Sequence, residues 1–183
     1  HTRFKCDWSS DVCSSDLVVF GAALQQGAQA TNIARTSLLR AGLPVTVSGM
    51  SVDRQCASGL MAIATAAKEI ITDQMDVTIG GGVESISLVQ TPQMRVQPDP
   101  ELIAMHKDIY MPMLQTAEVV AKRYGISRDA QDEYALQSQQ RTAAAQAAGK
   151  FDDEIVSVTA NMAVVNKETK EVSYKEVTLA KDE

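Results

Sequence analysis

The chain has 183 residues, of which 45% are hydrophobic and only 4% aromatic, and its formal net charge at pH 7 is −6. This length suffices for one domain with a substantial core, or for part of a larger protein. The acidic balance argues against nucleic acid as a partner, because a phosphate backbone attracts basic surfaces. The sequence holds no apolar run of the ~18 residues that a membrane span needs. We therefore expect a globular protein that binds neither nucleic acid nor a membrane.

The first 17 residues, His1–Leu17, are polar and contain neither an apolar signal-peptide segment nor a small-residue cleavage pattern. Their sequence resembles the translation of a sequencing-library adaptor with a short variable index around Lys5. We expect this segment to lie outside the native fold, and the alternative is a genuine polar arm. Apart from Cys6 and Cys13 in this segment, the sequence has a single cysteine, Cys56. One cysteine forms neither an intrachain disulfide framework nor a cysteine-based zinc site, and it fits a reducing compartment.

An alternation of strands and helices is predicted from the end of this segment onward. Val18–Gly21 is a short apolar run, which is typical of a buried strand. Thr31 or Asn32 can cap a helix that carries Ile33, Leu38 and Leu39 on its apolar face, and Gly42 ends this helix. The polar residues between the strand and the helix predict a loop.

Two further strands and one helix follow. Val45–Val52 is mostly β-branched and predicts a strand with a bend or bulge near Gly49. From Cys56 the pattern is helical, and Val77–Ile79 predicts a third buried strand that ends in a turn at Gly80–Gly82. The apolar stripe that we expect to face the sheet consists of Leu60, Ile63, Ala67 and either Ile70 or Ile71. This order of elements predicts an α/β fold with layers around a central sheet.

The character of the sequence changes after these elements. Ser87–Met111 is rich in Pro, Gln and Met and predicts an irregular surface excursion. Met113–Tyr124 is amphipathic, and Ser127 can cap a second helix over Arg128–Ala148. Strands are predicted at Ile155–Thr159 and Val172–Leu179.

Cys56 stands where the second predicted strand gives way to a helix. The N-terminus of a helix offers unpaired N–H groups and the positive end of the macrodipole, and both favour the thiolate, which is the nucleophilic form of cysteine. The small residues Ala57, Ser58 and Gly59 leave room for an acyl group and for its carbonyl oxygen to reach backbone donors. On this pattern alone, a small core residue is the alternative interpretation.

Several motifs together resemble one enzyme family. Val52–Leu60, which reads VDRQCASGL, is similar to the signature around the acyl-accepting cysteine of the thiolases, and Gly80–Ser87 resembles their second glycine motif. Further similarity continues through Pro112–Glu118, Tyr124–Arg128, Gln131–Glu133, Ser138–Gln140 and Phe151–Val156. The chain is identified on these motifs as a member of the thiolase family. The related condensing enzymes also use a cysteine at such an elbow but lack this helix-rich excursion.

The resemblance implies a thiolase-like layered α/β fold, of which the chain holds the N-terminal half. Residues 18–87 correspond to the core without its first strand, and residues 88–183 correspond to part of the inserted helix-rich loop domain. The family's histidine and second cysteine lie in later motifs that this sequence does not contain. We therefore expect a fragment that is inactive by itself.

The implied activity is that of an acyl-CoA acyltransferase, which moves an acyl group between a 3-ketoacyl-CoA and coenzyme A and needs no bound cofactor or metal. By resemblance, Cys56 is the nucleophile that forms the acyl thioester, and Met113 lines the acyl pocket. Pro112 stands where biosynthetic acetoacetyl-CoA thiolases have a histidine, which favours the degradative 3-ketoacyl type. A biosynthetic thiolase and a non-catalytic binding domain with this fold remain the alternatives. The complete protein is expected to be a cytoplasmic, bacterial-type homodimer or homotetramer. Val83 and the residues after Ser87 differ from the long excursion that builds the family's tetramers, which favours the dimer.

Overall fold

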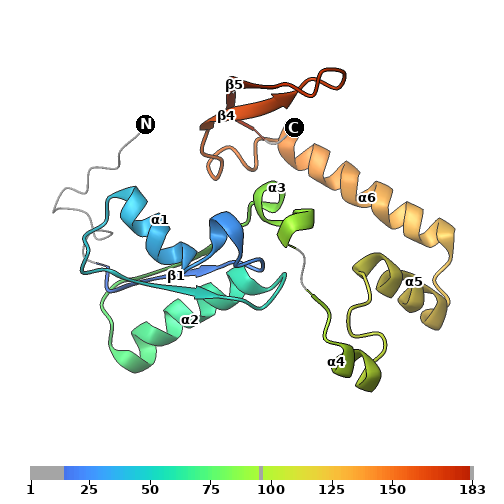
Figure 1. Cartoon of the computed structure of the whole chain (residues 1–183), viewed down its shortest axis with the longest axis horizontal. Helices are drawn as coiled ribbons and strands as arrows, with labels where there is room; N and C mark the ends of the chain where they lie inside the picture. The colour runs from blue at the N-terminus through green and yellow to red at the C-terminus, as the bar shows by residue number, and fades with distance from the viewer. Residues whose placement is uncertain (1–14, 95–96, 182–183) are drawn as a thin grey trace. The chain divides into compact units, whose positions relative to one another are not determined.

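The computed structural model describes residues 15–94 and 97–181. The chain divides into two compact units, of which the first ends at Pro100 and the second begins at Glu101 (Figure 1). This division falls later in the chain than the predicted boundary between residues 87 and 88. The predicted surface excursion therefore contributes residues to both units.

The N-terminal unit is built on a parallel sheet with the strand order β2-β1-β3. Its described elements, in chain order, are β1 (Leu17–Gly21), η2 (Gly27–Gln29), α1 (Ile33–Ala41), β2 (Ser48–Val52), α2 (Ser58–Asp73), β3 (Thr78–Gly82), α3 (Ile86–Val89) and η3 (Pro92–Met94). The pairing aligns Gly21 at the end of β1 with Val52 of β2 and with Gly82 of β3. All three strands therefore end at the same edge of the sheet.

The helices α1 and α2 cover opposite faces of this sheet (Figure 1). Successive residues of a strand point to opposite faces, so β1 contributes to two separate cores. Val19 packs with Ala62 and Ala66 of α2, whereas Val18 packs with Leu38 of α1. This helix–sheet–helix arrangement confirms the predicted α/β fold class.

α2 packs on the sheet through its small residues, and the prediction that its large apolar stripe faces the sheet was wrong. Ala62 and Ala66 are buried, whereas the residues of the predicted stripe are exposed: Leu60, Ile63, Ala67, Ile70 and Ile71. The cause is the close approach of the helix to β3, because a Cβ on Gly80 would lie 2.8 Å from Cα of Ile63. A helix backbone this near a strand leaves room only for small side chains between them.

The glycines of β2 and β3 lie in regular strands, which corrects two further predictions. Gly80–Gly82 form the last three residues of β3 and pair with β1, so they are not a turn. β2 begins only at Ser48, and Gly49 keeps the regular parallel register with Val18, so the bend or bulge predicted there was also wrong. A Cβ on Gly49 would lie 2.6 Å from Cα of Arg35, so this glycine allows α1 to approach the sheet.

The ends of α1 confirm the predicted helix. Asn32 is the N-cap, with a left-handed φ of 80°, and its side-chain oxygen accepts hydrogen bonds from Arg35 N at 3.1 Å and from Ser51 Oγ at 3.0 Å. Gly42 ends the helix in the left-handed conformation that glycine adopts without strain. Leu39, however, is 42% exposed and does not belong to the buried face.

The expectation that His1–Leu17 lies outside the fold is wrong at the end of this segment. Leu17 begins β1 and is 8% exposed. The Asp16 carboxylate accepts hydrogen bonds from the backbone N–H of Asp76 at 2.8 Å and of Val77 at 3.2 Å. These contacts attach the entry of β1 to the entry of β3. The rest of the expectation, for residues 1–14, lies outside the described residues.

The C-terminal unit consists of helices and a two-stranded antiparallel sheet. Its elements are α4 (Pro100–Met105, whose first residue belongs to the other unit), α5 (Met113–Tyr124), α6 (Arg128–Ala147), β4 (Val158–Val165) and β5 (Val172–Leu179). Ser127 caps α6 as predicted, because its hydroxyl accepts a hydrogen bond from Ala130 N at 3.2 Å. β5 has the predicted bounds, whereas β4 begins later and is longer than predicted.

Candidate active site

The three loops that follow β1, β2 and β3 meet at one edge of the sheet, because the three strands end in register. In open α/β sheets, ligands bind in crevices outside the carboxyl ends of the strands. A hollow of about 590 Å³ lies at this edge. The residues that line it include Leu24, Cys56, Gly59, Val83, Glu84 and Ile86.

Cys56 lies on a tight elbow between β2 and α2. Gln55, the residue before it, has a φ of 50°, which non-glycine residues seldom adopt and which therefore needs support from its surroundings. The hydroxyl of Ser58 supplies this support, because it donates to Gln55 O at 2.6 Å and accepts from Arg54 N at 2.8 Å. Asp53 Oδ1 accepts a third hydrogen bond, from Gln55 N at 2.8 Å. The residues around the cysteine thus determine the shape of the elbow.

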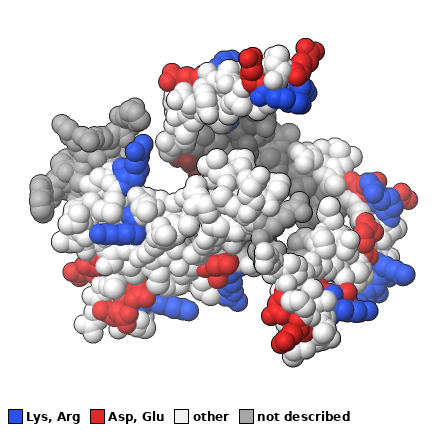
Figure 2. Space-filling view, viewed as in Figure 1, with Lys and Arg blue, Asp and Glu red and all other residues white. Residues whose placement is uncertain are grey.

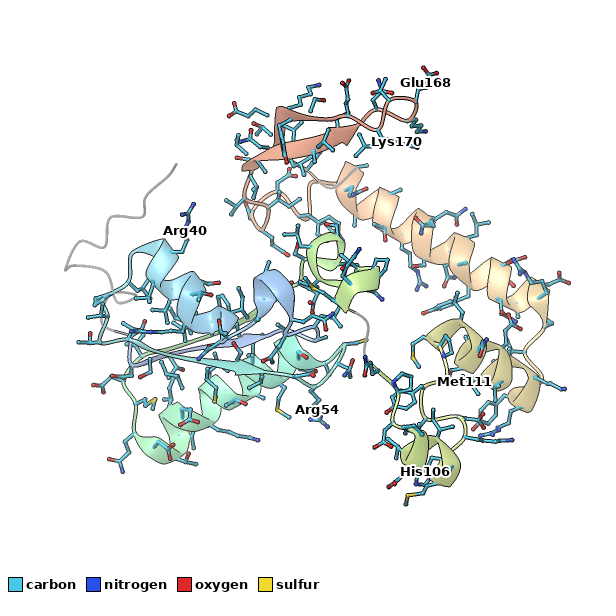
Figure 3. The ribbon with its side chains drawn as sticks, in the orientation of Figure 1. Arg40, Arg54, His106, Met111, Glu168 and Lys170 are labelled. Carbon is cyan, nitrogen blue, oxygen red and sulfur yellow. The ribbon has the colours of Figure 1, made fainter. Side chains whose placement is uncertain are left out.

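The thiol of Cys56 is free and exposed. The space next to it is also open, since a Cβ on Gly59 would meet no atom within 4 Å. Among the described residues, none accepts a hydrogen bond from the backbone N–H of Gly59 or of Leu60. These donors at the start of α2 can meet negative charge on a ligand. Figure 3 shows Arg54, whose exposed side chain leaves the same elbow.

A buried hydrogen-bond network joins the loops after β1 and β3, and the sequence analysis missed it. The side chain of Gln29 is 2% exposed, and its Nε2 donates to Leu24 O at 2.9 Å and to Glu84 Oε1 at 2.5 Å. Its Oε1 accepts from Ser85 N, and Ala23 N donates to Glu84 Oε2 at 2.7 Å. Glu84 lies within the motif Gly80–Ser87, but only the fold brings Gln29 to it.

Met113, the second predicted site residue, is the first residue of α5 in the C-terminal unit and is 72% exposed. Its contact with an acyl group stays a prediction. Within residues 15–94 and 97–181, no group of three or more His, Cys, Asp or Glu side chains is placed to hold a metal ion. No helix in these ranges is long and apolar enough to cross a membrane. On the face shown in Figure 2, basic side chains lie among acidic ones.

The family described as "Thiolase, N-terminal domain" matches residues 11–181 of this chain. The chain belongs to the thiolase family. It is 41% identical over 170 residues to the 3-ketoacyl-CoA thiolase of Bacillus subtilis, a match that covers 92% of this chain and 43% of the relative. It is 44% identical over 164 residues to the beta-ketoadipyl-CoA thiolase of Acinetobacter baylyi, with 79% and 40% covered.

The thiolase fold is also shown by a solved structure. The crystal structure of the Bacillus anthracis acetyl-CoA acetyltransferase matches with a TM-score of 0.70 and 33% sequence identity, over 95% of this chain and 44% of that chain. The chain therefore spans less than half the length of the thiolases that it matches here. The family match begins at residue 11, so it includes all of β1, from Leu17 onward.

Proposed function

We propose that Cys56 accepts the acyl group, as a thioester, in a thiolase reaction between a 3-ketoacyl-CoA and coenzyme A. The observation that carries this proposal is the exposed thiol on a supported elbow beside a hollow of about 590 Å³. Hollows of roughly 300–1,000 Å³ are typical of small-molecule sites. The identity of the relatives as 3-ketoacyl-CoA and beta-ketoadipyl-CoA thiolases supports the same reaction class.

In the degradative direction, the Cys56 thiolate attacks the 3-keto carbon of the substrate. When the resulting carbonyl re-forms, the bond between C2 and C3 breaks, and the enolate of acetyl-CoA takes up a proton and leaves as acetyl-CoA. The sulfur of a coenzyme A thiolate then attacks the thioester on Cys56. This second step releases the shortened acyl-CoA and restores the Cys56 thiolate. Covalent catalysis of this kind divides one difficult step into two easier ones.

The proposal also includes the direction of the reaction, which we propose is degradative. Pro112, in the position before Met113, supports it by resemblance, and so does the similarity to the 3-ketoacyl-CoA thiolase of B. subtilis. We place Met113 at the acyl pocket and the protein in the bacterial cytoplasm as a homodimer or homotetramer. Coenzyme A thioesters are its substrates, and the reaction uses no metal or other bound cofactor.

The 183-residue chain by itself is proposed to be inactive. Thiolysis needs a base that activates Cys56 and a second acid or base for the coenzyme A and enolate steps. The resemblance assigns these roles to a histidine and a second cysteine in motifs that this sequence does not contain. Each such group contributes ~10²–10⁴ in rate, so turnover by this chain should be lower by a factor on the order of 10⁴ or more.

The test uses the protein expressed from the complete reading frame that encodes this chain. Thiolysis is measured with acetoacetyl-CoA and with a longer 3-ketoacyl-CoA, for the unchanged protein and for Cys56→Ala and Cys56→Ser. Both variants should keep the circular dichroism spectrum and lose turnover with both substrates, and the unchanged protein should prefer the longer substrate. Full activity of Cys56→Ser would reject the proposed nucleophile. Failure of the unchanged protein to turn over either thioester would favour a binding domain.

A further inference from the structure

We infer that Gln29 and Glu84 are a positioning pair for the acyl group that reacts with Cys56. The pair holds the loop after β1 against the loop after β3, and both loops line the hollow. It thereby keeps the carbonyl carbon of the bound acyl group within reach of the thiol. This inference rests on the proposed role of Cys56.

The first argument is that every hydrogen-bonding group of the Gln29 amide has a partner. Nε2 donates to Leu24 O and Glu84 Oε1, and Oε1 accepts from Ser85 N. An amide has two N–H donors and one oxygen, so this arrangement uses both donors and the oxygen. The Gln29 side chain is 2% exposed, so removing one partner would cost folding free energy, because water cannot replace the lost hydrogen bond of a buried group.

The second argument explains why a carboxylate stands at position 84. Both of its partners, Ala23 N and Gln29 Nε2, are donors. Only an ionised carboxylate accepts on both oxygens, whereas an amide would place a donor against one of these donors. The two donors that face position 84 therefore favour a carboxylate there over an amide.

The third argument concerns the acyl group that the pair positions. The loop after β1 contributes Ala23 and Leu24 to the hollow, the loop after β3 contributes Val83 and Glu84, and Cys56 lies on the elbow after β2. An acyl group in the hollow is thus bounded by the two loops that the pair connects. Displacing reacting atoms by about 1 Å can cost on the order of 10²-fold in rate.

A separate tether makes the inference testable without unfolding the site. Gln26 Nε2 donates to Val89 O at 2.7 Å, so the same two regions stay attached when the Glu84 contact is weakened. Glu84→Gln keeps the size and shape of the side chain and removes one acceptor. Thr78→Val is the matched control, because it removes the hydrogen bond from Thr78 Oγ1 to Ala66 O, 2.9 Å long, at the opposite end of β3.

Two rates are measured for each variant of the protein from the complete reading frame. One is kcat/KM for thiolysis of a 3-ketoacyl-CoA, which requires a placed acyl group. The other is the alkylation rate of Cys56 by iodoacetamide, which does not. Glu84→Gln should lower kcat/KM about tenfold or more while alkylation changes less than about twofold. Thr78→Val should leave both rates within about twofold of the unchanged protein.

The inference is overturned if Glu84→Gln retains kcat/KM within about twofold, or if both rates fall together, as a general loosening of the fold would cause. The proposed function has a separate test in Cys56→Ser. A protein in which Cys56→Ser is inactive and Glu84→Gln is fully active would keep the proposed function and reject the positioning pair.

Discussion

Gly21→Ala is expected to destabilise the N-terminal unit strongly, because β1 ends directly against the first turn of α2. A Cβ on Gly21 would lie 2.2 Å from the carbonyl carbon and oxygen of Ser58 and 2.5 Å from Gly59 N. These are backbone atoms, so the start of α2 must move by roughly 1 Å before ordinary contact distances return. Overpacking of this kind costs about 1–3 kcal/mol. The movement also disturbs the Ser58 hydrogen bonds that support the elbow, which are worth about 1 kcal/mol each. We therefore expect a loss of about 3 kcal/mol.

Gly59→Ala is the matched control, because the same methyl group enters open space there. Alanine is favoured over glycine inside a helix by about 0.5–1 kcal/mol, so this variant should be slightly more stable than the unchanged chain. Urea unfolding followed by far-UV circular dichroism measures both changes. The reasoning fails if Gly21→Ala unfolds within about 0.5 kcal/mol of the unchanged chain, or if the two variants lose equal stability.

Two more predictions follow from particular contacts. Asp16→Ala should lower the free energy of unfolding by about 1–3 kcal/mol, because the Asp16 carboxylate accepts two backbone hydrogen bonds. Deletion of residues 1–14 should leave the urea unfolding midpoint unchanged. Urea titrations that show the reverse would contradict both expectations. The hydrogen bond from Arg128, together with its positive charge, lowers the pKa of Asp132. The pair therefore stabilises α6 fully at pH values above the ordinary aspartate pKa, and this contribution is lost as the pH falls through the lowered pKa. An NMR titration should place the Asp132 midpoint below that of a free aspartate, and Arg128→Ala should return it to the ordinary value; an unchanged midpoint would show that the pair does not form.

The features that were predicted correctly depend on residues close together in the sequence. Asn32 and Gly42 bound α1, and Ser127 begins α6, because caps are local hydrogen bonds and local backbone conformations. The position of Cys56 between a strand and a helix is local in the same way. These parts of the fold and of the candidate site could therefore be predicted from short stretches of sequence.

The features that were missed depend on residues far apart in the sequence. The buried face of α2 is determined by glycines of β3, so the helix pattern alone predicted the wrong face. The hydrogen bond between Gln29 and Glu84 joins residues separated by 55 positions, and the contact from Asp16 to Asp76 spans 60. Polar side chains in loops give no signal of such partners until the strand order brings their loops together.

The most direct test of the proposed nucleophile is to locate the acyl group after a short reaction. The protein from the complete reading frame is mixed with a 3-ketoacyl-CoA without free coenzyme A, quenched in acid, digested and examined by mass spectrometry. The peptide that contains Cys56 should carry the shortened acyl group, and later addition of coenzyme A should remove it. In Cys56→Ser, this mass increase should be absent from every peptide after the same short reaction. An acyl group that coenzyme A removes from another residue while Cys56 stays unmodified would contradict the assignment of Cys56 as the acyl acceptor.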